Sequence, residues 1–199
     1  MLIEAAILAG GASRRMGTDK AWLRLRGPTG PTLIEALVAL LEPDYGPVRI
    51  LAGESSVEPY ATLGVVVQSD LRPHSGPLGG IHSALSLAER DVVLVVPCDL
   101  PFLTREFLEG LSVLLSGHDA VVPRPDGVPV PVCAFYSSRC LSAVETRLDR
   151  GYLKAADFLE DLAVRWVEGQ ELARLDPEGT ALFNLNTPED MERARRMVR

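Results

Sequence analysis

The chain has 199 residues, of which 47% are hydrophobic and 24% charged, as is ordinary for a globular domain that buries a substantial core. Its formal net charge of −7 argues against a nucleic-acid-binding surface, because such a surface needs an excess of Lys and Arg. No apolar run is as long as a membrane-spanning helix, and Met1 leads directly into a predicted strand. We therefore expect one cytoplasmic domain over residues 1–199, with neither a membrane nor a nucleic acid as partner.

Apolar runs typical of strands alternate with amphipathic runs typical of helices, which predicts an α/β fold with parallel strands joined by helical crossovers. The predicted strands cover residues 2–8, 48–52, 65–67, 92–96, 120–122, 130–136 and 164–167. The predicted helices cover residues 33–41, 78–89, 102–115, 138–148 and 153–162, with a last helix after Thr187. Capping boxes formed by Thr32 with Glu35, and by Thr187 with Asp190, indicate where the first and last helices begin. The run 92–96 contains no polar residue, so we expect a central strand that is buried on both faces.

A glycine pair follows the first predicted strand in the segment Leu8-Ala9-Gly10-Gly11, and three cations come soon after it, namely Arg14, Arg15 and Lys20. Glycine has no Cβ atom, so the backbone can turn sharply here and bring N–H groups close to phosphate oxygens, while the cations add charge-assisted donors. The segment lacks the Gly-Lys-Ser/Thr ending of a Walker loop and the spacing of a dinucleotide-binding loop. We favour a polyphosphate site of a third kind; a tight turn flanked by solvated arginines is the alternative.

The predicted central strand ends in the segment Pro97-Cys98-Asp99-Leu100-Pro101. In open α/β sheets, ligands bind beyond the carboxyl ends of the strands, so Asp99 should reach the same edge as the glycine pair. Mg²⁺ is held in such sites by one or two carboxylates together with substrate phosphates. We expect Asp99 to bind Mg²⁺ beside a polyphosphate; a role in a turn or a helix cap before Pro101 is the alternative.

The whole segment from Leu8 to Lys20 resembles the opening signature of the molybdenum cofactor guanylyltransferases, L-A-G-G-x-S-x-R-M-G-x-D-K. The later positions in register are Ser13, Arg15, Met16, Gly17, Asp19 and Lys20. The resemblance implies a single-domain Rossmann-like fold of the nucleotide-diphospho-sugar transferase type, with a mostly parallel sheet and helices on both faces. It also implies transfer of GMP from GTP to the terminal phosphate of molybdopterin, with Mg²⁺ as cofactor and pyrophosphate as the second product. Delivery proteins of the molybdenum cofactor, or its target apoenzymes, are the implied protein partners.

A second segment, residues 70–80, extends the resemblance to the family's loop D-x-x-P…G-P-L-A-G, which contributes to recognition of the base. Gly79 stands where alanine is usual in that loop. The nucleotide-binding residues implied by the two segments and by the end of the central strand are Leu8, Ala9, Gly10, Gly11, Lys20, Asp70, Gly76, Pro77, Leu78 and Asp99. For Asp70, a turn-forming role is the alternative.

A third segment, Asn184 to Asp190, resembles the family's element N-x-N-T-P-E-D, which lies near the acceptor. Alternate residues of a strand point to the same face, so we expect Asn184 and Asn186 to project together from a short strand toward the acceptor. Amide side chains both donate and accept hydrogen bonds, which suits a pterin ring. Turn and capping chemistry accounts for Thr187 to Asp190 without a ligand, but it does not account for Asn184.

The implied reaction depends on positioning and charge neutralisation. The acceptor phosphate is already an anion, so its attack on the α-phosphorus needs no strong general base, and the expected catalytic residues are Arg15, Lys20 and Asp99. A cytidylyltransferase that acts on the same acceptor is the nearest alternative, although Leu8 to Gly11 and Gly76 to Leu78 favour guanine. Another small-molecule nucleotidyltransferase and a non-catalytic nucleotide-binding module are more distant alternatives.

Overall fold

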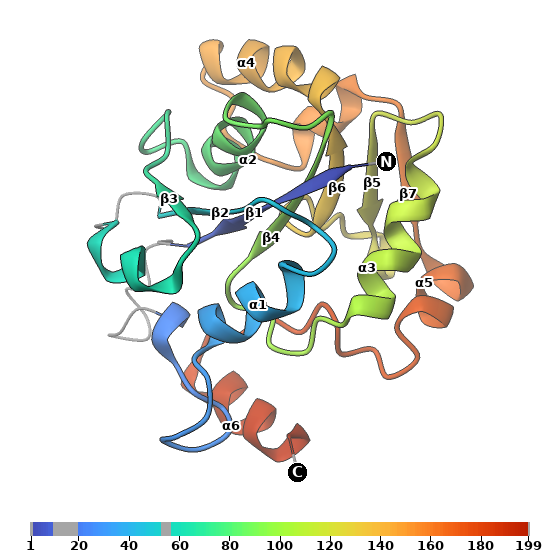
Figure 1. The fold of residues 1–199 in the computed structure, drawn as a ribbon. Coiled ribbons are helices and arrows are strands. Elements are labelled where there is room, and N and C mark those ends of the chain that lie inside the picture. The colour runs from blue at the N-terminus through green and yellow to red at the C-terminus, as the bar shows by residue number, and fades with distance from the viewer. Residues whose placement is uncertain (1, 10–19, 53–56, 199) are drawn as a thin grey trace.

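The structure, a computed structural model, describes residues 2–9, 20–52 and 57–198. In these residues the backbone forms one sheet of seven strands in the order β3-β2-β1-β4-β6-β5-β7 (Figure 1). The strands are β1 (Ile3–Leu8), β2 (Val48–Leu51), β3 (Val66–Gln68), β4 (Val92–Pro97), β5 (Ala120–Pro123), β6 (Ala134–Ser137) and β7 (Val164–Val167). The α-helices are α1 (Leu33–Leu41), α2 (Gly76–Ser86), α3 (Arg105–Ser112), α4 (Leu141–Asp149), α5 (Gly169–Leu175) and α6 (Pro188–Met197). Short 3-10 helices are η1 (Lys20–Trp22), η2 (Glu58–Leu63), η3 (Val113–Leu115), η4 (Pro125–Gly127), η5 (Ser138–Cys140) and η6 (Asp157–Asp161).

Helices cover both faces of the sheet, as the sequence predicts. Ile7 of β1 lies in one apolar cluster with residues of α1 and α3, whereas its neighbour Ala6 lies in a second cluster with residues of α2 and α4 (Figure 1). The side chains of alternate strand residues thus pack into two separate cores, one on each face of the sheet. The run Val92–Val96 is at most 4% exposed at each residue, which confirms the predicted central strand. None of the helices in the described residues is long and apolar enough to cross a membrane.

The sheet is mostly parallel, and its exception is β6. This strand runs antiparallel to β4 and to β5, whereas β5 runs parallel to β7. Only the loop 124–133 separates β5 from β6, and a parallel crossover needs a dozen or more residues with a helix. Since β5 and β7 therefore point the same way as β1 and β4, the carboxyl ends of all four strands lie at the same edge.

Both predicted capping boxes are present. The side chain of Thr32 accepts a hydrogen bond from the backbone of Glu35, and Thr187 does the same for Asp190, while each carboxylate bonds back to the cap. Helix α2 starts at Gly76, two residues before the predicted start. These caps satisfy backbone donors that a helix leaves unpaired at its first turn.

Two predictions of local structure are wrong here, and one helix was not predicted. Residues 153–162 do not form an α-helix: Tyr152 and Leu153 stay exposed, and a single turn of η6 brings Phe158 and Leu159 into the core side by side. The strand predicted over residues 130–136 is shorter, because residues 130–133 form a turn before β6. Helix α5 was not predicted: it has only seven residues, none of them fully buried, and only Leu172 and Leu175 pack against the core.

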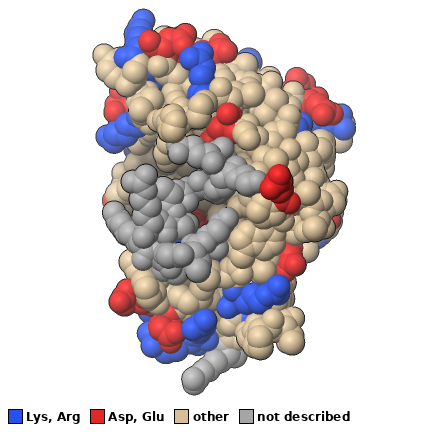
Figure 2. Space-filling model, turned by 90° about the vertical axis from the view of Figure 1, so that its left-hand side faces the viewer, with Lys and Arg blue, Asp and Glu red and all other residues tan. Residues whose placement is uncertain are grey.

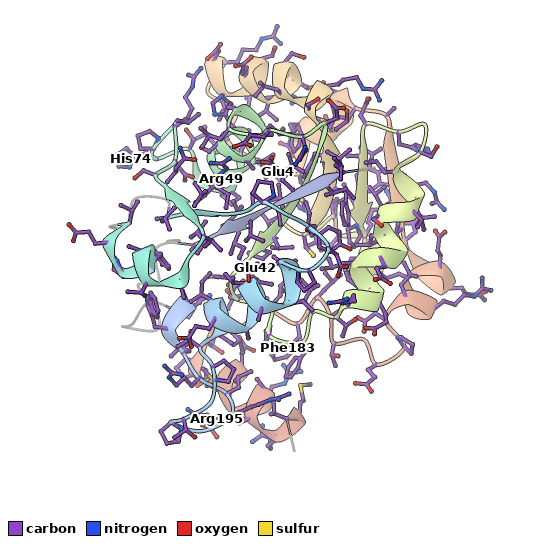
Figure 3. The ribbon with its side chains drawn as sticks, viewed as in Figure 1. Glu4, Glu42, Arg49, His74, Phe183 and Arg195 are labelled. Carbon is purple, nitrogen blue, oxygen red and sulfur yellow. The ribbon has the colours of Figure 1, made fainter. Side chains whose placement is uncertain are left out.

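Buried charges join β1 and β2 to the chain that follows α2. Glu4 is 1% and Arg49 is 6% exposed, and their side chains lie near one another beneath α2 (Figure 3). Oε2 of Glu4 accepts a hydrogen bond of 2.7 Å from the backbone of Glu89, and the carboxylate of Glu89 lies 3.5 Å from Arg49. Burial raises the pKa of Glu4. The contacts of Glu4 and Arg49 hold the first residues of β1 in place. Because β1 is a single six-residue strand, they also help to position its carboxyl end.

Candidate active site

The strand order reverses between β1 and β4, because the chain runs outward from β1 through β2 and β3 on one side and through β4 on the other. In open α/β sheets, the crevice beyond the carboxyl ends at such a point is the usual ligand site. Here Leu8 pairs with Pro97, and the backbone N–H of Cys98 donates a 3.1 Å hydrogen bond to the carbonyl of Leu8. Asp99 therefore leaves the sheet directly beside Leu8 and Ala9.

Figure 2 shows the molecule from the side at which β1 ends. Acidic and basic side chains of the described residues lie mainly toward the upper and lower ends of this view. On this face the described residues show charge of both signs and no continuous basic surface of the kind that binds nucleic acid.

Three polar side chains from distant parts of the chain meet at this edge. Nζ of Lys20 lies 3.0 Å from Oδ2 of Asp99 and 2.9 Å from Oδ1 of Asn186. The side chains of Lys20 and Asp99 are each 15% exposed, so their ion pair is less screened than one on the open surface. The second carboxylate oxygen of Asp99, Oδ1, is buried and has no hydrogen-bond partner among the described residues. The cluster thus places a cation beside an available carboxylate oxygen.

Asn186 reaches the cluster from a segment that is not a strand, contrary to the prediction. Residues 183–187 have no strand assignment, and only Leu185 is tied to the edge of the sheet, through a 3.0 Å hydrogen bond from its N–H to the carbonyl of Asp99. Asn184 and Asn186 flank the buried Leu185 and are both exposed. Asn186 contacts Lys20, whereas the side chain of Asn184 makes no hydrogen bond to a described residue.

The loop between β3 and α2 lies at the same edge, because β3, β2 and β1 are parallel. Asp70 follows β3 by two residues and is half-buried. At the start of α2, Gly76 and Pro77 are exposed, but the side chain of Leu78 is fully buried in the core. A ligand at this helix start could meet the backbone of Leu78 but not its side chain.

Glycine is required where this loop folds back on α2. A Cβ atom on Gly79 would lie 2.8 Å from the carbonyl oxygen of Arg72 and 2.8 Å from Cβ of Ser75, closer than real contacts allow. A Cβ atom on Gly80 would lie 3.0 Å from the side chain of Leu8. The departure from the alanine that is usual at position 79 therefore has a steric reason in this chain: its loop packs against the helix too closely for a methyl group.

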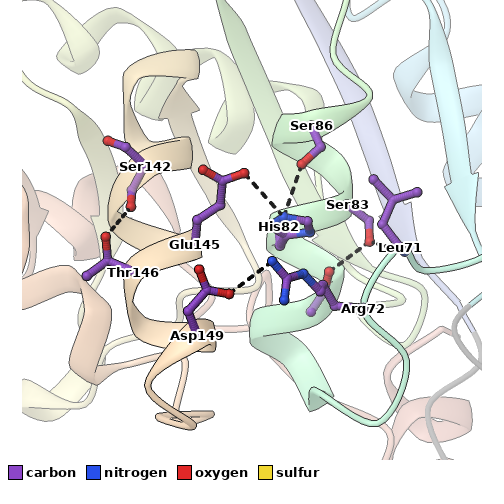
Figure 4. A network of polar contacts seen from close by, with 10 residues as sticks. Leu71, Arg72, His82, Ser83, Ser86, Ser142, Glu145, Thr146 and Asp149 are labelled. Carbon is purple, nitrogen blue, oxygen red and sulfur yellow. Dashed lines mark hydrogen bonds and ion pairs between the residues drawn. The ribbon is translucent and has the colours of Figure 1, made fainter.

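Two contacts hold the loop in that position. The backbone N–H of Leu71 donates a 2.8 Å hydrogen bond to Oγ of Ser83, which in turn donates one of 2.9 Å to the carbonyl of Gly79. Arg72 forms a 3.0 Å ion pair with Asp149 at the end of α4 (Figure 4). The loop that carries Asp70 is thus fastened to both α2 and α4.

The side chain of His82 projects from α2 toward α4 (Figure 4). It is 5% exposed, and its Nε2 lies 3.3 Å from Oγ of Ser86 and 3.9 Å from the carboxylate of Glu145. Burial, and secondly the charge of Arg72, lower the pKa of His82, against the opposing effect of Glu145 and Asp149. A neutral histidine therefore belongs to the packing that supports the loop.

Several predicted site residues lie outside the described part of the chain. They are Gly10, Gly11 and Arg15, and of the remaining signature also Ser13, Arg14, Met16, Gly17 and Asp19. The described residues at either end of this segment are Ala9, which is 3% exposed, and Lys20, the first residue of η1. The predicted roles of the residues between them stay predictions.

A second charged pair at the same edge was not identified from the sequence. Arg124 directly follows β5, and its Nε lies 2.6 Å from the carboxylate of Glu168, which directly follows β7. The guanidinium of Arg124 also lies 4.6 Å from the ring centre of Trp166. Its hydrogen bond lowers the pKa of Glu168. The only sequence feature that could have indicated this pair is its position, because each residue directly follows a strand that ends at the same edge of the sheet as β4.

Comparison with known proteins identifies the family. The model of the MobA-like NTP transferase domain matches residues 5–166. A probable molybdenum cofactor guanylyltransferase of Pelotomaculum thermopropionicum is 37% identical over 192 residues, which cover 96% of this chain and 91% of that protein. A molybdenum cofactor guanylyltransferase of Syntrophotalea carbinolica is 34% identical over 199 residues, which cover 97% and 90%.

A solved structure agrees with these sequence relatives. Molybdopterin-guanine dinucleotide biosynthesis protein A from Archaeoglobus fulgidus superposes with a TM-score of 0.83 at 29% identity, over 98% of both chains. The match to the family model covers most of the chain, and relatives above 30% identity cover nearly all of it. This chain therefore belongs to the molybdenum cofactor guanylyltransferases and is a nucleotidyltransferase of the MobA-like group.

Proposed function

We propose that this protein transfers GMP from GTP to the terminal phosphate of molybdopterin and releases pyrophosphate. The observation that carries the proposal is the Lys20–Asp99 pair at the carboxyl ends of β1 and β4, in a chain whose relatives are named for guanylyl transfer in molybdenum cofactor synthesis. A cation and a carboxylate in one partly buried site suit a substrate with several phosphates.

In the proposed reaction, an oxygen of the acceptor phosphate bonds to the α-phosphorus of GTP. The bond from that phosphorus to the oxygen that bridges to the β-phosphorus breaks, and its electron pair leaves with pyrophosphate. A phosphate monoester is largely ionised near neutral pH, so no residue has to remove a proton from the nucleophile. The residues have to bring two anions together and offset their charge, which is the task of Lys20 and, from outside the described residues, Arg15.

We further propose that Asp99 binds Mg²⁺. Its buried Oδ1 is a hard oxygen donor with no hydrogen-bond partner among the described residues, and one such carboxylate is what Mg²⁺ uses together with phosphate oxygens and water. The described residues contain no group of three or more His, Cys, Asp or Glu side chains placed to hold a metal. When bound, the metal would neutralise charge on the phosphates.

The two substrates are proposed to meet next to Asp99, beyond the carboxyl ends of β1 and β4. The phosphates of GTP would lie against the segment Leu8 to Gly11 and against Lys20, and the base against Asp70 and the helix start Gly76 to Leu78. Asn184 and Asn186 are the proposed acceptor-side residues. A cytoplasmic location suits a GTP-dependent reaction and the lack of a disulfide between Cys98, Cys133 and Cys140. Molybdenum cofactor delivery proteins or target apoenzymes are the proposed partners.

Nucleotide titration tests the proposal. Calorimetry with GTP, CTP and ATP, each with and without Mg²⁺, should show GTP binding about tenfold or more tightly than the others, as expected when polar groups of a site match one base. Binding of GTP should strengthen with Mg²⁺, and GTP together with molybdopterin should release pyrophosphate. Equal affinity for CTP would favour the cytidylyltransferase alternative. Tight binding of GTP without release of its pyrophosphate when the acceptor is added would favour a non-catalytic module.

A further inference from the structure

We propose that Asn186 is a positioning residue for Lys20: its side-chain oxygen holds the ammonium beside Asp99 without cancelling the positive charge. The inference deepens the proposed function, since it concerns the cation that would contact the phosphates of GTP. It gives Asn186 a role on the nucleotide side of the site, in addition to the acceptor side.

The contacts of Lys20 account for two of its three N–H donors. One points to Oδ2 of Asp99 at 3.0 Å and one to Oδ1 of Asn186 at 2.9 Å, and no described residue accepts from the third, which we assign to a phosphate oxygen. A lysine side chain has a flexible four-carbon stem, so a single contact would leave its ammonium free to move around Asp99. Two contacts from different directions fix where the third donor points.

The chemistry of the second contact matters as much as its geometry. Asp99 already offsets the charge of Lys20, so a second carboxylate would make this cluster net negative, and a negative cluster repels a triphosphate. An amide oxygen accepts the same hydrogen bond and is neutral. Asn186 therefore anchors Lys20 and preserves the attraction of the site for an anion.

Asn186 is itself held from two sides. Its backbone N–H donates a 3.0 Å hydrogen bond to Oδ2 of Asp190, the residue that completes the capping box of α6. The preceding residue, Leu185, is fully buried and donates from its backbone to the carbonyl of Asp99 at 3.0 Å. The oxygen that Lys20 meets is thus placed by the start of α6 and by Asp99 together. Asn184, which is exposed and lacks such a contact among the described residues, is a matched control for Asn186.

Lysine reactivity tests the contact without any nucleotide. The chain contains only two lysines, Lys20 and Lys154, and Lys154 is 75% exposed, so it serves as an internal reference. The folded protein is treated with an amine-acylating ester, and the two lysine-containing peptides are followed by mass spectrometry. Asn186→Ala should raise the acylation rate of Lys20 by about threefold to tenfold, as expected for the loss of one hydrogen bond, and leave that of Lys154 unchanged. Asn184→Ala should change neither rate, and Asn186→Asp should keep Lys20 as slow as in the wild type.

Titration with GTP and Mg²⁺ then tests the consequence. Asn186→Ala should weaken binding by about threefold to tenfold, Asn184→Ala should not, and Asn186→Asp should weaken it although Lys20 stays protected. An unchanged Lys20 rate in Asn186→Ala, or the same increase in Asn184→Ala, would overturn the inference. So would a lower melting temperature of Asn186→Ala with normal Lys20 reactivity, because that is the result of a merely structural role. If the wild type binds no GTP, the proposed function fails, and the labelling result still decides whether Asn186 holds Lys20.

Discussion

Asp99→Asn is the most direct test of the site, because it keeps the size of the side chain and removes its charge. Lys20 lies 3.0 Å from Asp99, so the gross attraction at an effective dielectric constant of about 20 is about 5.5 kcal/mol. Desolvation of both partners offsets most of this, and the 15% exposure of each side chain screens part of the remainder. We expect the free energy of unfolding to fall by only about 1 kcal/mol, which lowers Tm by about 2–4 °C in a chain of this size.

Catalysis should suffer far more than stability. Loss of one preorganised electrostatic group typically lowers kcat by about 100-fold or more, which corresponds to about 2.7 kcal/mol of transition-state stabilisation. An amide at position 99 would also bind Mg²⁺ more weakly than the carboxylate does. Affinity for GTP should therefore lose its dependence on Mg²⁺. In the absence of metal it should stay the same or increase, because the carboxylate no longer repels the triphosphate.

The assay combines pyrophosphate release, calorimetry with and without Mg²⁺, and thermal melting. Asp157→Asn is the matched control, because Asp157 forms the second lysine–aspartate pair among the described residues, with Lys154 at 2.8 Å, and both of those side chains are more exposed than Lys20 and Asp99. The control should retain wild-type turnover and wild-type dependence on Mg²⁺. Turnover of Asp99→Asn within about threefold of the wild type would refute the metal-binding role, because removal of a metal ligand should lower kcat far more than that.

Three further variants test the parts of the site separately. Lys20→Ala should lower kcat/KM by about 100-fold and should lower kcat itself; steady-state kinetics at saturating GTP would show an unchanged kcat with a raised KM if Lys20 only binds. Gly79→Ala should weaken GTP binding by about tenfold in calorimetry, because its Cβ would lie 2.8 Å from the carbonyl oxygen of Arg72 and displace the loop; wild-type affinity would separate that loop from the site. His82→Gln should reduce the loss of stability on acidification. The pKa of His82 is lowered from 6.5, so as the pH falls below 6.5 the unfolded chain takes up the proton first and stability drops. Urea unfolding at about pH 7.5 and about pH 5.5 measures this, and an identical pH dependence in the variant and the wild type would contradict it.

Elements with a strong local signal could be predicted from the sequence. The uninterrupted run Val92–Val96 is a central strand, because a strand that lies between two helical layers must be apolar on both faces. The first turns of α1 and α6 were located by their capping boxes, in which a side chain must replace missing backbone partners. The end of β4 then placed Asp99 at the correct edge of the sheet, since parallel strands present their carboxyl ends together.

Elements that depend on tertiary packing could not be predicted. The direction of β6 is set by the short loop that precedes it, but the length of that loop was hidden by an apolar run that looked like a longer strand, residues 130–136. Residues 153–162 have helical composition, yet Gly151 adopts a φ of +76° and the chain turns there, leaving a single turn of 3-10 helix to bury Phe158 and Leu159. In both places the surrounding structure overrides the local preference.

The contact between Lys20 and Asn186 was also beyond the reach of the sequence, because 166 positions separate the two residues and no spacing rule connects them. The sequence resemblance assigned Asn186 to the acceptor and Lys20 to the nucleotide. The structure puts them 2.9 Å apart. The two substrates of a group transfer must meet, so the residues assigned to each should come together where the bond is made.

A small third core explains how the two ends of the chain are brought to one place. Leu185 and the α6 residues Met191 and Ala194 are buried against Leu33 of α1, with Leu23 packed beside them. Leu23 also donates a backbone hydrogen bond to the carbonyl of Lys20 at 3.0 Å, so the same core that seats α6 holds the segment that carries Lys20 (Figure 1). The match to the family model ends at residue 166, before this helix. Yet α6 packs into the same core as the segment that carries Lys20, and we infer that the C-terminal helix helps to set the distance between Asn186 and the cation proposed to bind the nucleotide.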